Sequence, residues 1–141
     1  MKSIYILLLL IAVTCMTACN KMDENGALDG NWQLTEWRTA TGDSIIATNH
    51  TRKIYYSVKY DILKFQDMLD ASNYHCLAYF RHQADTLVVE RAFSQPFDDV
   101  IPLDSLANYG CPANGRFLIR RLTHEHLVLS SDLGVLTFRK F

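Results

Sequence analysis

Few side chains in this 141-residue sequence have the types and spacing that chemistry requires. His124 and His126 lie two residues apart, so on a strand they would share a face and could chelate a metal ion. Their segment, Thr123–His126, is instead typical of a hairpin turn, and no third ligand is indicated. The sequence therefore predicts no metal site and no cofactor.

Acidic and nucleophilic residues lead to a similar expectation. Asp98 and Asp99 stand near Asp104, but paired carboxylates in a loop usually serve as hydration and helix-capping groups. No serine lies in a G-x-S-x-G elbow, and no glycine-rich phosphate loop is present. We expect no catalytic residue, and hence a protein that is not an enzyme.

Cys19 is the residue for which the sequence predicts a definite chemical role. Met1-Lys2-Ser3 gives a positive start, residues 4–13 are almost wholly apolar, and small residues precede Cys19, which is the pattern of a secretory signal peptide. The apolar run is shorter than the roughly 20 residues that a membrane helix needs. Its end resembles a bacterial lipobox, although Met16 replaces the usual leucine. We therefore expect residues 1–18 to be removed and Cys19 to carry lipid that anchors the protein to a membrane.

Residues 19–29 are mostly polar and predict a flexible tether between the anchor and the folded domain. Lys21-Met22-Asp23-Glu24 resembles the lysine-plus-acidic export signals of some lipoproteins of Gram-negative gut anaerobes, and it fits a plain solvated linker equally well. Asn20 is not the aspartate that retains some lipoproteins in the inner membrane. The expected location is the outer membrane, with the lipid-anchored protein either periplasmic or surface-exposed.

The composition fits one globular domain. Hydrophobic residues make up 49% of the chain, and its formal net charge is -1. A disordered protein would be less apolar, and a nucleic-acid-binding protein would carry a basic patch. We therefore expect no nucleic acid partner.

The first strand is expected at residues 30–37. Because side chains alternate along a strand, Trp32 and Leu34 would point to one face and Trp37 to the other. Both faces would then carry a tryptophan. Gly30 has no Cβ, which lets the strand enter a sheet over the end of a core.

The rest of the chain predicts short strands joined by turns. One long strand is expected over residues 54–62, and Leu103–Tyr109 followed by Gly110 predicts one or two helical turns closed by a glycine. Further strands are expected at residues 74–81, 86–93, 116–122, 127–130 and 135–141. This order predicts an all-β fold, a small antiparallel up-and-down β-barrel of about eight strands over residues 30–141, with a short helical turn before the last strands.

The two ends of this predicted domain resemble those of a known family. Gly30-Asn31-Trp32 and the late Arg139 are similar to the lipocalin signature, in which these residues pack together at the closed end of an eight-stranded barrel. More closely, most of residues 28–141 resembles the small lipocalin-like lipoproteins of gut anaerobes. The resemblance implies that Gly30, Trp32 and Arg139 form the barrel end. If Phe138 faces the interior, however, Arg139 faces outward, so its cover over Trp32 depends on where the barrel ends.

The apolar alternation predicts an interior rich in aromatic side chains. A barrel of eight strands is filled by side chains or holds one small ligand, so we expect at most a shallow cup where Tyr56 or Tyr60 binds a small apolar or amphipathic ligand. The alternative is a filled barrel that contacts another envelope protein through its outer face or loops. The residues expected inside are Trp32, Leu34, Tyr56, Val58, Tyr60, Cys76, Ala78, Phe80, Leu87, Val89, Phe117, Ile119, Leu136 and Phe138.

Two cysteines besides Cys19 would remain after cleavage. An envelope location permits a disulfide between Cys76 and Cys111. Cys76 falls on the expected interior face, where a free buried cysteine is ordinary, so we favour two free thiols.

Overall fold

The computed structural model describes residues 24–47, 52–96 and 99–141, together with Met1 and Ile4. Cys19 and the expected signal peptide lie outside these residues, apart from Met1 and Ile4. Among the described residues, no helix has the length and apolar character to span a bilayer. The elements are η2 (Gly26–Leu28), β1 (Gly30–Arg38), β2 (Ser44–Ala47), β3 (Ile54–Lys59), β4 (Ile62–Asp67), β5 (His75–Gln83), β6 (Thr86–Gln95), β7 (Val100–Ile101), η3 (Leu103–Tyr109), β8 (Arg116–Leu122), β9 (His126–Ser131) and β10 (Gly134–Lys140).

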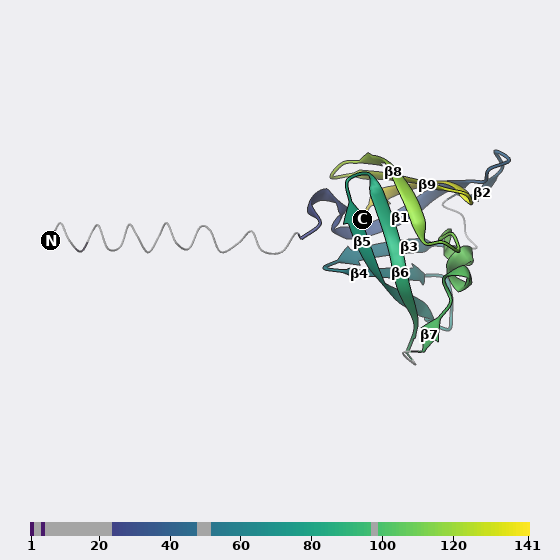
Figure 1. Cartoon of the computed structure of the whole chain (residues 1–141), viewed down its shortest axis with the longest axis horizontal. Coiled ribbons are helices and arrows are strands. Elements are labelled where there is room, and N and C mark those ends of the chain that lie inside the picture. The colour runs from purple at the N-terminus through teal and green to yellow at the C-terminus, as the bar shows by residue number, and fades with distance from the viewer. Residues whose placement is uncertain (2–3, 5–23, 48–51, 97–98) are drawn as a thin grey trace.

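The strands form one antiparallel sheet that closes on itself (Figure 1). Their order is β10-β9-β8-β6-β5-β4-β3-β1, and pairing of β10 with β1 completes a ring of eight strands. The two short strands lie outside the ring, with β2 paired to β1 and β7 paired to β6. The predicted up-and-down β-barrel with a short helical turn before the last strands is confirmed.

A turn at Tyr60 divides the long strand that the sequence suggested. Strand β3 ends at Lys59, which pairs with Ile62 at the start of β4. Tyr60 has a φ of 56°, so the chain reverses there, and its side chain is 47% exposed. The prediction that Tyr60 lines the interior is wrong, because alternation along a single strand does not continue through a hairpin turn.

A β-bulge in β1 brings both tryptophans to the interior. Leu34 pairs with Phe138 and Glu36 pairs with Thr137, so Thr35 is an extra residue that reverses the alternation. Trp37 therefore faces the core, where its indole N–H donates a hydrogen bond to the Leu133 carbonyl at 3.0 Å. The expectation that the two tryptophans lie on opposite faces is wrong for this reason.

Similar register shifts occur in β6 and β8. Glu90 is the extra residue between the pairs Tyr79–Arg91 and Phe80–Val89. Arg120 is the extra residue between the pairs Ile119–Leu129 and Arg121–Val128. Each bulge bends its strand and lets the apolar side chains continue on the inner face beyond it.

Short helices cover the two opposite ends of the barrel (Figure 1). At one end, Leu28 of η2 is fully buried, and its carbonyl accepts a hydrogen bond from the Trp32 indole N–H at 2.7 Å. At the other end, η3 inserts Leu106 and Tyr109 into the core. Gly110 ends η3 with a φ of 87°, as the sequence predicted.

Most of the expected interior residues are buried. Apart from Tyr60, the exception is Ile119, which is partly buried against the core. Burial of the others follows from the alternation of each strand on the inner side of the ring. The core also contains residues that the sequence did not assign to it, namely Leu28, Trp37, Ile54, Leu63, Phe65, Ala92, Leu106, Tyr109, Cys111, Leu127 and Leu129.

Candidate functional site

Tyr56 and Tyr60 do not form a common ligand site. Tyr56 is 1% exposed, and its hydroxyl donates a hydrogen bond to the Tyr109 carbonyl at 2.7 Å. Burial holds the pKa of the Tyr56 hydroxyl well above its ordinary value, so this group stays protonated. Tyr60 lies outside the barrel in the β3–β4 turn. The two tyrosines proposed as ligand contacts are therefore separated by the barrel wall.

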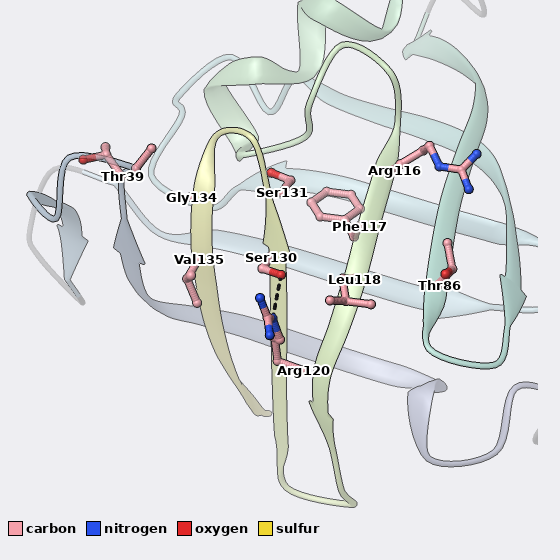
Figure 2. A pocket seen from close by; sticks show the side chains of 11 residues that line it. Thr39, Thr86, Arg116, Phe117, Leu118, Arg120, Ser130, Ser131, Gly134 and Val135 are labelled. Atoms are coloured by element: carbon pink, nitrogen blue, oxygen red, sulfur yellow. Dashed lines mark hydrogen bonds between the residues drawn. The ribbon is translucent and has the colours of Figure 1, made fainter.

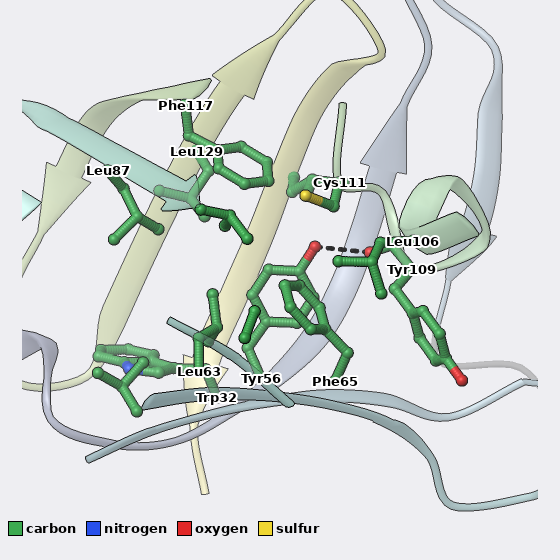
Figure 3. Close-up of a cluster of buried hydrophobic side chains, with 14 of the residues drawn as sticks. Trp32, Tyr56, Leu63, Phe65, Leu87, Leu106, Tyr109, Cys111, Phe117 and Leu129 are labelled. Carbon is green, nitrogen blue, oxygen red and sulfur yellow. Dashed lines mark hydrogen bonds between the residues drawn. The ribbon is translucent and has the colours of Figure 1, made fainter. Parts of the chain in front are cut away.

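The barrel interior is packed with large side chains (Figure 3). The Tyr56 ring lies 4.6 Å from the Phe65 ring and 4.7 Å from the Phe138 ring, centroid to centroid. The large side chains of the core, from Trp32 near η2 to Leu106 of η3, are almost completely covered by their neighbours. A side chain so fully covered has no water-sized space beside it, so these side chains enclose no internal cavity that a ligand could occupy.

Lys140, and not Arg139, covers Trp32 at the η2 end. The Lys140 ammonium lies 4.6 Å from the centre of the indole ring and donates hydrogen bonds to the carbonyls of Ala27 at 3.0 Å and Asp29 at 2.8 Å. Arg139 faces outward, and its guanidinium donates two hydrogen bonds to the Gln33 side-chain oxygen. Strand alternation explains why Lys140 takes the place that was predicted for Arg139, because Phe138 and Lys140 share the inner face.

Gly30 lies directly beneath this cation. Its φ is 125°, and a Cβ built there would stand 3.2 Å from the Lys140 side chain. A larger residue would therefore crowd the Lys140 side chain and would also be strained at this positive φ. Gly30 and Trp32 meet at the barrel end, with Lys140 as their basic partner.

An open groove of about 600 Å³, which we name the arginine groove, runs over the outer face of β8, β9 and β10 (Figure 2). Pairing of Thr86 with Leu118 and of Leu118 with Ser130 places three strands side by side here. Arg116 and Arg120 project from β8 into the groove. The Arg120 Nε donates a hydrogen bond to the Ser130 hydroxyl at 3.0 Å, which fixes the direction of the guanidinium.

The arginine groove combines positive charge with exposed apolar surface. Leu118 and Val135 are the partly exposed aliphatic side chains of its floor, and no acidic side chain lines it. A second hollow of about 280 Å³ continues it and shares Arg116 and Thr86. Arginines present planar arrays of donors that match carboxylate and phosphate oxygens, so this surface suits an anionic partner with apolar groups.

The other reactive residues do not assemble into a site. No group of three or more His, Cys, Asp or Glu side chains that could hold a metal occurs in the described part of the chain. His124 and His126 are exposed at the β8–β9 turn, and Asp98 lies outside the described residues. Cys76 and Cys111 are free and buried, the alternative that the sequence favoured, and burial raises the pKa of the Cys111 thiol to about 12.

The comparisons with known proteins agree with this geometry. The model of the lipocalin-like domain family matches residues 14–141, so the chain belongs to that family. A lipocalin-like protein from Bacteroides uniformis has a similar structure, with a TM-score of 0.61 at 20% identity over 82% of this chain and 100% of its own. A protein from Bacteroides eggerthii gives a TM-score of 0.57 at 19% identity over 80% of this chain and 98% of its own.

A third similar structure, from Burkholderia xenovorans, has a TM-score of 0.53 at 14% identity over 80% of this chain and 82% of its own. At these identities the likeness concerns the fold alone. No curated protein matches the chain.

Proposed function

We propose that the protein is a non-enzymatic lipoprotein of the outer membrane that acts through the outside of its barrel as an interaction module for another envelope protein. The packed interior is the observation that carries this proposal. A lipocalin-like barrel that carried a ligand inside would need an internal cavity. Here the buried side chains that lie between Trp32 at the η2 end and Leu106 at the η3 end occupy that space. A partner would then bind the outer face of the barrel.

The arginine groove is the surface that we assign to this contact. It is open and shallow enough for a protein partner, and its exposed Leu118 and Val135 supply apolar area that becomes buried on binding. Arg116 and Arg120 would pair with carboxylates at the edge of the contact. The expected partner is a protein surface with acidic side chains around an aliphatic patch.

The groove can be tested with a photo-crosslinking amino acid in place of Leu118, in cells that produce the full chain. We expect an adduct of one defined mass. Its yield should fall about tenfold when Arg116→Glu and Arg120→Glu are combined, which corresponds to a loss of about 1.4 kcal/mol in the free energy of binding. Arg121→Glu is the matched control, because Arg121 is an exposed arginine of the same strand that does not line the groove. Loss of the adduct in the control, or its persistence in the double variant, would refute the assignment.

The anchor is tested separately at Cys19. Intact mass of the membrane-extracted protein should correspond to cleavage before Cys19 plus acyl chains, because the proposed lipid is attached at that residue. Cys19→Ala should leave the chain unprocessed or release it from the membrane fraction. A mature protein in which Cys19 is an unmodified thiol would exclude the lipid anchor.

A further inference from the structure

A second groove, which we name the tyrosine groove, lies on the outer face of β1, β3 and β4. It has a volume of about 360 Å³, which is within the range of small-molecule sites, and it shares no residue with the arginine groove. Besides the amide side chains Asn31 and Gln66, its lining residues are Lys53, Tyr55, Ser57, Lys64, Met68 and Phe141. Proposals about the two grooves therefore succeed or fail independently.

The tyrosine groove contains two aromatic rings and a methionine side chain. The Phe141 backbone N–H donates a hydrogen bond to the Asn31 carbonyl at 2.8 Å, which holds the last residue beside β3. Its ring then meets the Tyr55 ring edge-on, with centroids 5.5 Å apart. Phe141 is 75% exposed and Met68 is 57% exposed, so both retain apolar surface that a ligand could cover.

Two lysines stand at opposite ends of this groove. Lys64 lies directly across from Ser57, at the end nearer the β3–β4 turn. Lys53 lies beside Met68, whose backbone N–H donates to the Lys53 carbonyl at 2.9 Å. The four residue-to-residue steps from Lys64 to Met68 separate the two ends by about 13 Å, at about 3.3 Å per step. No acidic side chain lines the groove, and among the described residues neither ammonium has an ion-pair partner.

Asp67 fixes the far end of the groove without neutralising it. Its carboxylate accepts hydrogen bonds from the backbone N–H groups of Lys53 at 2.8 Å and Leu69 at 3.1 Å, and it pairs with the Arg52 guanidinium at 3.1 Å. Burial alone would raise the pKa of Asp67, but these partners outweigh it and the pKa is lowered. The negative charge of Asp67 is therefore satisfied by the backbone and Arg52, so it does not neutralise the charge of the two lysines.

We propose that the tyrosine groove binds a small amphipathic carboxylate. The Lys64 ammonium and the Ser57 hydroxyl donate to the carboxylate oxygens, because these two residues are direct neighbours on paired strands. The apolar chain of the ligand lies over Tyr55 and Phe141 and ends against Met68. Lys53 contributes the aliphatic part of its side chain at that end and keeps its ammonium in water.

Titration with octanoate tests this site in the full processed protein held in lipid nanodiscs, with empty nanodiscs to measure partition into lipid. Methionines carry a 13C-methyl label, so the Met68 signal reports the groove and Met22 serves as an internal reference. We expect octanoate to shift the Met68 signal in a saturable way, and octanamide, which has the same chain without the charge, to bind at least about tenfold more weakly.

Three lysine variants separate the proposed roles. Lys64→Gln should weaken octanoate binding about tenfold, because it removes the charged donor to the carboxylate. Lys53→Gln should weaken it less than about twofold, since that ammonium stays exposed. Lys59→Gln is the matched control, because Lys59 lies over the exposed Tyr60 ring, outside the groove, and it should leave binding unchanged.

The proposal is wrong if octanamide binds as tightly as octanoate, or if Lys59→Gln weakens binding as much as Lys64→Gln does. It is also wrong if octanoate leaves the Met68 signal in place. Shifts confined to the indole signals of Trp32 and Trp37 would point to binding inside the barrel instead. Unchanged binding in the Arg116→Glu and Arg120→Glu variant would show that the tyrosine groove works without the arginine groove.

Discussion

Trp32→Ala should lower the free energy of unfolding by about 4 kcal/mol, measured by denaturant unfolding followed by circular dichroism. The substitution removes the largest fully buried side chain at the η2 end of the barrel. It also leaves the Leu28 carbonyl without its indole donor and the Lys140 ammonium without its aromatic face. These losses act at one place, so they add to the cost of the cavity.

Trp32→Phe separates the contribution of the aromatic ring from that of the indole hydrogen bond to the free energy of unfolding. Phenylalanine keeps a ring beneath Lys140 but has no N–H for Leu28, so we expect it to cost about 2 kcal/mol, roughly half of the loss in Trp32→Ala. Tyr79→Ala, on the exposed outer face of β5, should cost much less than either variant. A loss below about 1 kcal/mol in Trp32→Ala would show that Trp32 does not hold this end of the barrel together.

Leu106→Ala should lower the free energy of unfolding by about 3 kcal/mol and create a cavity at the η3 end that binds benzene. Leu106 is fully buried, and the packed wall around it includes Tyr56, whose hydroxyl is bonded to the backbone of η3. A rigid wall cannot collapse into the space that the shorter side chain leaves. Benzene should therefore raise the melting temperature of the variant and leave that of the natural protein unchanged.

This second prediction tests the filled barrel itself. Ser105→Ala is the matched control, because Ser105 is an exposed residue of the same helix and its replacement opens no space. If benzene raises the melting temperature of the natural protein as much as that of Leu106→Ala, the interior already holds an accessible cavity. The proposal that the protein works through its outer face would then lose its main support.

The alternation of apolar residues predicted the fold and most of the core because the inner faces of these strands repeat every second residue. It failed where the backbone departs from regular geometry. The extra residue Thr35 turned Trp37 inward, and the turn at Tyr60 placed that side chain outside. Bulges and two-residue turns depend on the register in which a strand pairs with its neighbours. The sequence of a single strand does not specify that register.

The two grooves could not be predicted from the sequence for a related reason. Arg116 lies near Thr86 because β8 pairs with β6 in one register, although 30 positions separate them in the chain. Phe141 covers Tyr55 because β10 closes on β1 beside β3. Lys140 lies over Trp32 for the same reason, because β10 pairs with β1. The only indication in the sequence was alternation along the last strand, which places Lys140 on the same face as Phe138 and Arg139 on the other face.

The pairing of β1 with β10 also sets the order in which the chain can fold. Every other neighbouring pair in the ring joins strands that follow one another along the chain, apart from the short strands β2 and β7, whereas this one joins the two ends of the domain. The first strand to leave the ribosome must wait for the last, and the entropic cost of joining such distant segments slows the final step. Until the last strand is in place, both partners therefore present unpaired edges that can join other chains.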